Sequence, residues 1–240
     1  MPAAASPAAE GELQTGRLRA LVDVARGTRG FMPDDEGEAL LRAALRAGRS
    51  QVEGAEPPTF VEIGAWCGKS TVYLGAAAEA TGAVLLSIDH HRGSEENQPG
   101  WEHHEPDLVD TRVGRIDTLL QWRNTITGAG LESSVVGVVG DSATVAARWD
   151  RPLSFCFIDG GHGHEPAWAD FRGWSPRVAL GGWLAIHDVF PNPADGGRPP
   201  YELYQAALES GEYVDDGACG SLRVLRRVAR LHAASAAAAP

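Results

Sequence analysis

The chain has 240 residues, of which 43% are hydrophobic and 22% charged, and these proportions indicate a globular protein with one substantial core. Its formal net charge of −11 disfavours nucleic acid and an anionic membrane surface as partners, because both repel a negative surface. The three cysteines form no CxxC pair, residues 1–10 are unlike a signal peptide, and no apolar stretch reaches the roughly 18 residues of a spanning helix, so we expect a cytoplasmic protein.

Two predicted helices precede any strand. Residues 13–27 and 36–48 both carry apolar side chains at helical spacing, which predicts a pair of amphipathic helices that cap the sheet. The two ends of the chain are rich in alanine and of low complexity, so we expect them to be disordered. The expected boundaries are a tail, a single domain that begins with the cap helices, and a second tail: 1–10, 11–230 (cap helices within 11–50) and 231–240.

From Thr59 onward, short apolar runs alternate with helical or mixed segments. The apolar residues in these runs are continuous rather than alternating, as expected for strands that are covered on both faces. The alternation of the runs with helices predicts a parallel sheet with right-handed crossovers. The predicted strands are 59–63, 83–88, 134–139, 153–158 and 182–187, with a closing strand over 219–225. The predicted helical or mixed segments are 69–80, 113–129, 142–148, 165–178 and 200–210.

The connection over residues 89–112 is long and contains almost no apolar residues. Long connections within compact domains are usually functional or disordered. Because this one follows a strand, it is predicted to lie at the edge of the sheet where ligands bind.

A glycine-rich turn follows the first strand, in the segment VEIGAWCGKST. Gly64 and Gly68 permit a tight turn and a close approach of a ligand to the backbone, and the helix that begins near Lys69 offers free amides to an anion. An ordinary strand–helix turn with a solvated lysine is the plain alternative. A phosphate loop fits poorly, because that motif needs four residues between its first glycine and the Gly-Lys pair, and Gly64 leaves three.

The second predicted strand ends at Asp89. An acid at this point is placed to accept hydrogen bonds from ribose hydroxyls, although it could also simply cap a turn. Together, Glu62, Gly64, Gly68 and Asp89 favour a nucleoside site over a phosphate loop.

With these motifs in place, the sequence resembles the class I S-adenosylmethionine-dependent methyltransferases over roughly residues 58–190. The segments that carry the resemblance are VEIGAWCGKST, SIDHH, VVGDSA (138–143), LSFCFIDGGH (153–162) and ALGGWLAIHDVF (179–190). The last two are similar to segments of the small metal-dependent O-methyltransferases of the catechol type and of those that act on macrolide sugars.

The resemblance implies a doubly wound, mostly parallel, seven-stranded sheet and S-adenosylmethionine as the cofactor. The first turn would shape the methionine and ribose pocket, Asp89 would hold the ribose, His90 would pack against adenine, and Asp141 and Ser142 would border it. The complete set of implied cofactor-binding residues is Glu62, Gly64, Ala65, Gly68, Ser70, Asp89, His90, Asp141, Ser142 and Asp159.

The resemblance also implies a catalytic pair and a metal site. Asp159 matches a metal ligand at the tip of the fourth strand, and His162 matches the general base three positions later. His187 and Asp188 match an acidic pair or Asp-Asn, so the histidine departs from the pattern. Three possibilities remain open. Asp159, His187 and Asp188 could hold one cation, and the imidazole would then favour manganese, iron or zinc; Asp159 and Asp188 alone could hold magnesium; or no metal binds and His162 acts by itself.

The reaction expected from these features is O-methylation of a small hydroxylated molecule, such as a sugar or a secondary metabolite. A histidine can remove the acceptor's proton near neutral pH, and a divalent cation would lower the pKa of the hydroxyl. The alternatives are a phosphate-loop-like nucleotide enzyme, a non-catalytic S-adenosylmethionine-binding protein, and a different reaction on the same fold. A homo-oligomer is compatible with the sequence.

Overall fold

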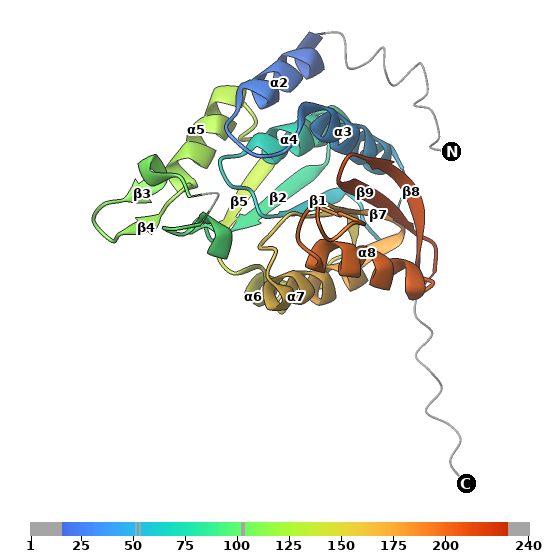
Figure 1. Cartoon of the computed structure of the whole chain (residues 1–240). Coiled ribbons are helices and arrows are strands. Elements are labelled where there is room, and N and C mark those ends of the chain that lie inside the picture. Colours follow the sequence, from blue (N-terminus) through green and yellow to red (C-terminus); the bar gives the residue numbers. More distant parts are fainter. Residues whose placement is uncertain (1–15, 51, 53, 102–103, 230–240) are drawn as a thin grey trace.

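The computed structural model describes residues 16–50, 52, 54–101 and 104–229, and the predicted tails 1–10 and 231–240 lie outside these ranges. Within the described part, a seven-stranded sheet carries helices on both faces (Figure 1). The strands are β1 (Thr59–Ile63), β2 (Val84–Asp89), β5 (Val135–Val139), β6 (Leu153–Ile158), β7 (Val178–Ile186), β8 (Tyr213–Cys219) and β9 (Leu222–Arg227). None of the helices in these ranges has the length and apolar character to cross a membrane.

The strand order is β5-β2-β1-β6-β7-β9-β8. The first five of these strands pair in parallel, whereas β9 is antiparallel to both β7 and β8. The predicted fold class, a doubly wound and mostly parallel seven-stranded sheet, is therefore confirmed. Every residue of β6 is buried, which explains why its sequence is mostly apolar and does not alternate.

The C-terminal end of the sheet differs from the prediction. The expected closing strand over 219–225 spans the turn of a hairpin at Gly220 and Ser221, and it includes only the end of one strand and the start of the next. β8 was missed because its residues are largely polar and exposed, as suits a strand at the edge of the sheet.

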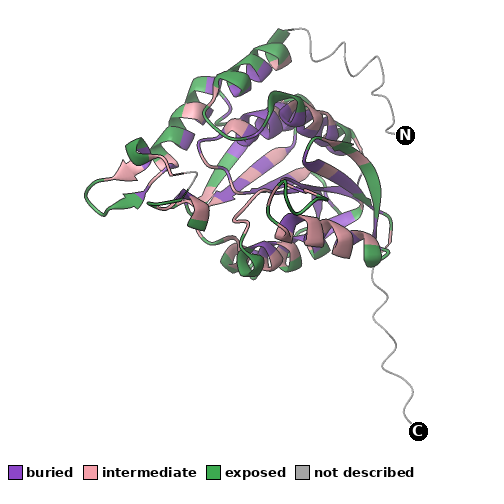
Figure 2. Ribbon diagram, in the orientation of Figure 1, coloured by how far each residue is buried: buried purple, intermediate pink, exposed green. Residues whose placement is uncertain are grey.

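One face of the sheet is covered by four helices: α2 (Gly16–Gly27), α3 (Asp34–Arg49), α4 (Lys69–Thr81) and α5 (Leu119–Ala129). Every residue from Ser70 to Ala78 of α4 is buried, because the sheet lies on one side and the other helices on the other (Figure 2). Of the two expected cap helices, α3 packs against α4 and contacts β6, β7 and β9, so it is part of the layer that covers the sheet. α2 packs on α4.

The opposite face carries α6 (Ser142–Ala146), α7 (His164–Trp174), the 3-10 turn η3 (Ser175–Arg177) and α8 (Pro199–Glu209). The fully buried Trp174 anchors this layer in the second part of the core. The helices cover the two faces of the sheet, and the carboxyl ends of the parallel strands lie at the edge where the candidate site is found.

The long connection after β2 contains short regular elements in its described residues. These are the 3-10 turns η1 (Glu95–Asn97) and η2 (Pro106–Leu108) and a two-stranded hairpin of β3 (Val109–Asp110) and β4 (Arg115–Ile116). Arg29, in the segment before α3, forms ion pairs with Glu105 at 2.7 Å and with Asp107 at 2.6 Å. The connection is thereby fastened to the N-terminal helices.

Candidate active site

The carboxyl ends of β1, β2, β6 and β7 meet at one edge of the sheet. Backbone hydrogen bonds continue the ladder just beyond the strands, from Gly64 to Ile88 (3.0 Å), from Asp159 to Ile63 (2.9 Å) and from His187 to Ile158 (3.1 Å). These bonds bring the first residues after each strand into one place, as the parallel topology predicts.

Gly64 makes the turn after β1 possible. Its φ of +84° is in the left-handed region, and a Cβ atom at this position would lie 2.0 Å from the carbonyl oxygen of Asp159. Only glycine satisfies both the conformation and this close approach. The glycine-rich turn is therefore packed directly against the tip of β6.

Asp89 ties the second strand to this turn. Its Oδ2 accepts hydrogen bonds from the amides of Ala65 (2.8 Å) and Trp66 (3.0 Å), and its Oδ1 accepts one from the amide of His91 (2.6 Å). The carboxylate that was assigned to ribose thus also fixes the shape of the turn. A substitution of Asp89 would therefore disturb the turn as well as any contact with a ligand.

Glu62 lies beneath the turn and is fully buried. Its Oε2 accepts hydrogen bonds from Thr71 (2.7 Å) and Ser87 (2.6 Å), whereas its Oε1 has no hydrogen-bond partner among the described residues. Burial disfavours the charged form and raises the pKa of Glu62 to about 7, against the opposing effect of these hydroxyls. The fold therefore keeps a buried acceptor oxygen unsatisfied next to the glycine-rich turn.

Lys69 does not point into a phosphate cradle. Its Nζ lies 2.9 Å from Oδ1 of Asp34 at the start of α3, and its side chain is only 12% exposed. The ion pair with Asp34 accounts for a lysine at the N-terminus of α4. Together with the three-residue spacing after Gly64, it removes the support for a phosphate loop.

The residues expected near adenine lie beyond β2 and β5. Asp141 caps α6 by accepting a hydrogen bond from the amide of Thr144 (2.7 Å), and Ser142 donates from its hydroxyl to the buried Asp170. His90 is exposed and follows Asp89 directly. The polar residues expected near adenine thus lie close to one another. Asp170 joins this group, although the sequence did not indicate it.

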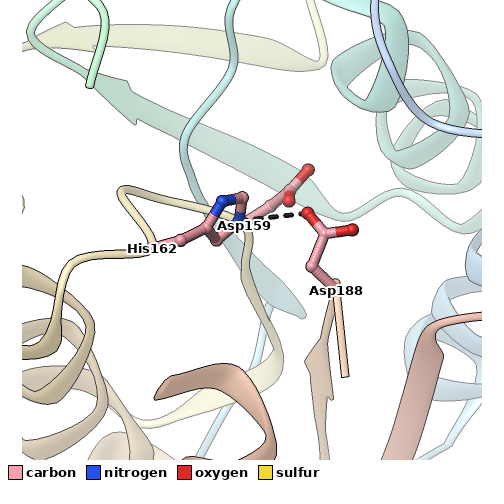
Figure 3. Close-up of side chains that lie close together, drawn as sticks. All are labelled: Asp159, His162 and Asp188. Carbon is pink, nitrogen blue, oxygen red and sulfur yellow. Dashed lines mark ion pairs between the residues drawn. The ribbon is translucent and has the colours of Figure 1, made fainter. Parts of the chain in front are cut away.

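Asp159, His162 and Asp188 form one compact group (Figure 3). Each offers a ligand atom, and these atoms all lie within 4.8 Å of one another. The Nε2 of His162 is 3.0 Å from Oδ2 of Asp188, and Figure 3 shows this carboxylate turned toward the ring. Asp188 has a φ of +54°, an uncommon conformation for a residue other than glycine, and such conformations concentrate at functional sites.

The acidic neighbours hold a proton on His162. Burial by itself lowers the pKa of His162, but its contacts with Asp188 and Glu96 outweigh burial and raise the pKa to about 10. The same contacts lower the pKa of Asp188. In this arrangement His162 is an imidazolium, so the expected role as a base requires that Asp188 be engaged by another partner.

His187 does not take the place that was expected of a metal ligand. It is 5% exposed, its Nδ1 lies 3.0 Å from Oδ1 of Asp159, and its Nε2 lies 2.8 Å from Oε2 of Glu36. With both ring nitrogens directed at carboxylate oxygens, neither has a lone pair free for a cation. Among the described residues, the group that can hold an ion therefore contains His162 in place of His187.

Two acids near the site were missed in the sequence. Glu96, in η1 of the long connection, lies 2.9 Å from Nδ1 of His162. Glu36 lies on the buried face of α3, four residues before the apolar Leu40, and an acid in such a stripe is the one signal that could have revealed it.

Comparison with known proteins agrees with this geometry. A family model described as a methyltransferase domain matches residues 61–189. The O-methyltransferase from Bacillus cereus in complex with SAH superposes with a TM-score of 0.57 at 15% identity, covering 92% of this chain and 96% of that one. TomG from Streptomyces achromogenes, an O-methyltransferase involved in tomaymycin synthesis and solved with SAM, gives 0.55 at 14% identity, covering 90% and 91%. Cofactor-bound Rv0187 from MTB gives 0.55 at 16% identity, covering 96% and 99%.

The family match spans more than half of the chain, so the chain belongs to the methyltransferase family. Its sheet has the fold of the class I S-adenosylmethionine-dependent methyltransferases, as the motifs predicted. At these sequence identities the solved structures support the fold alone.

Proposed function

We propose that this protein is an S-adenosylmethionine-dependent O-methyltransferase that acts on a small hydroxylated molecule with the help of a divalent cation. The observation that carries the proposal is the group of Asp159, His162 and Asp188, with ligand atoms within 4.8 Å of one another, directly beside the glycine-rich turn. The two carboxylates supply the oxygen donors that a divalent cation prefers, and the imidazole lies beside them as a candidate base.

The residues around the turn fit the cofactor. The unsatisfied Oε1 of Glu62 is a suitable acceptor for the ammonium group of the methionine part. Asp89 would receive the ribose hydroxyls, and Ser142 would border the adenine. When bound, the cofactor supplies an electrophilic methyl group on a sulfonium.

The remaining residues would prepare the acceptor. Asp159 and Asp188 would hold a cation that lowers the pKa of the acceptor hydroxyl. With Asp188 engaged in this way, His162 would keep Glu96 as its partner at Nδ1, and its Nε2 would be free to take the acceptor's proton. Alignment of the acceptor oxygen with the methyl group can supply several kcal/mol of barrier reduction.

The class of acceptor follows from the polar surroundings of His162. Glu96 and the largely polar connection that bears it would border the acceptor pocket next to His162, which favours a molecule with several hydroxyls over a flat apolar ring.

Transfer of a labelled methyl group tests the proposal. The full chain is incubated with methyl-labelled S-adenosylmethionine, manganese or magnesium, and panels of sugars, polyols and phenols, with nucleic acid as a comparison. We expect label to enter a small hydroxylated acceptor. Label that enters only amines, or only nucleic acid, would contradict O-methylation of a small molecule.

The buried Glu62 predicts how cofactor binding depends on pH. Its pKa of about 7 means that the carboxyl is mostly protonated at pH 5, whereas an ammonium group favours the carboxylate. The affinity for S-adenosylhomocysteine should therefore rise between pH 5 and pH 7 and then level off, with release of a proton on binding. Calorimetry in buffers of different ionisation enthalpy measures both effects. Glu62→Gln should remove this dependence and the surface variant Glu79→Gln should retain it; a pH-independent wild type would contradict the assignment.

A further inference from the structure

Glu36 is a buried carboxylate that has no assigned role in cofactor binding or in methyl transfer. It lies in the first turn of α3 and is 5% exposed. Removing an ionised carboxylate from water is unfavourable, and well-packed apolar residues usually give equal or greater stability. A buried acid therefore calls for an explanation in terms of the groups that it contacts.

The carboxylate of Glu36 is held in a dedicated cradle. Its Oε1 accepts a hydrogen bond from the amide of Ser221 (2.9 Å), and its Oε2 accepts one from the hydroxyl of the same residue (2.9 Å). The turn between β8 and β9 wraps closely around it, since a Cβ atom on Gly220 would lie 2.0 Å from Oε1. The position of the acid is thus fixed from two sides of the fold.

The third contact of Glu36 leads into the site. Nε2 of His187 lies 2.8 Å from Oε2 of Glu36, and Nδ1 of the same ring lies 3.0 Å from Oδ1 of Asp159 and 3.4 Å from Oδ2 of Asp188. The ring is 5% exposed and packs edge-on against Phe157. Its orientation is therefore set by Glu36 at one end and by the carboxylates at the other.

We propose that Glu36 is a positioning residue of this active site, which fixes the carboxylate of Asp159 through the ring of His187. The inference relies on the role that the proposed function gives to Asp159. It explains why a histidine is found where the resemblance implies an acid. His187 positions Asp159 from the side of Glu36, whereas His162 and Asp188 form the compact group with Asp159 (Figure 3). Supporting residues of this kind are commonly worth 10–100-fold in metal affinity or activity.

The test compares three variants of the full chain. Glu36→Gln keeps the size of the side chain and removes its charge. Ser221→Ala leaves the carboxylate but removes one of its donors. Glu38→Gln is the matched control, because Glu38 lies on the same helix and pairs with Arg26 and Arg42 outside the site. Nuclear magnetic resonance then follows the ring nitrogens of His187 and the carboxyl carbon of Asp159 in the protein without ligand.

We expect Glu36→Gln to shift the signals of both His187 and Asp159, Ser221→Ala to shift them by less, and Glu38→Gln to leave them in place. Manganese, titrated by electron paramagnetic resonance, should bind about 10–100-fold more weakly to Glu36→Gln, while S-adenosylhomocysteine should bind as well as to the wild type. Unchanged Asp159 signals in Glu36→Gln, or full manganese affinity, would overturn the proposal. If Glu36→Gln does not fold, the same signals in Ser221→Ala decide. A wild type that binds neither probe would refute the proposed function, whereas the resonance signals would still decide this inference.

Discussion

His162→Ala should slow the methyl-transfer step by about 10²–10⁴-fold while the affinity for S-adenosylhomocysteine stays unchanged. The imidazole is the only group of the compact cluster that can accept a proton near neutral pH once its acidic neighbours are engaged, and it does not belong to the glycine-rich turn. Rapid-quench measurement of a single turnover, with the acceptor found by labelling, gives the rate of the step itself.

The matched control is His164→Ala. His164 is the first residue of α7, two positions after His162, and it is exposed, with its ion-pair partner Glu165 also on the surface. It should retain the wild-type rate. If His162→Ala kept that rate as well, another group would have to take the proton, and the assignment of the base would be withdrawn.

Asp159→Asn should abolish most of the activity that depends on a divalent cation. The substitution keeps the shape of the side chain but removes the negative charge that a cation needs, and it also weakens the charge-assisted hydrogen bond with His187. We expect the loss to exceed that of His187→Ala, because His187 contacts the cluster from behind, and such supporting residues are commonly worth about 10–100-fold.

Chelation tests the same site without mutation. Activity should fall in excess chelator and return when manganese or magnesium is added. The exposed acid Asp195 supplies a control, since Asp195→Asn should leave the response to metal unchanged. Full activity in excess chelator, with elemental analysis that finds no retained metal, would rule out the cation and leave His162 as the proton acceptor to be tested.

Much of the fold could be predicted because its central strands are buried on both faces. The runs over 59–63 and 153–158 coincide with β1 and β6, in which almost every residue is buried. Asp89 and Asp159 could be placed for the same reason, since residues that follow parallel strands meet at one edge of the sheet. β8 could not be predicted, because an exposed edge strand needs no continuous apolar pattern.

The sequence pattern could not predict which histidine joins Asp159 and Asp188 in the compact group, because this depends on tertiary contacts. His187 and Asp188 are neighbours in the sequence and were expected to serve together, but successive side chains at the end of a strand point in different directions. The left-handed backbone of Asp188 turns its carboxylate toward His162, whereas His187 is drawn toward Glu36. Glu36 and Glu96 reach the site from an N-terminal helix and from the long connection, which only tertiary packing brings there.

Calorimetric titration of the wild-type chain tests the central claim most directly, with S-adenosylhomocysteine and ATP as the two ligands. The account predicts a simple one-site isotherm for S-adenosylhomocysteine and no binding of ATP, since the glycine-rich turn lacks the spacing of a phosphate loop and Lys69 is engaged by Asp34. The absence of S-adenosylhomocysteine binding, or binding of ATP in its place, would contradict the assignment of this site to an S-adenosylmethionine-dependent methyltransferase.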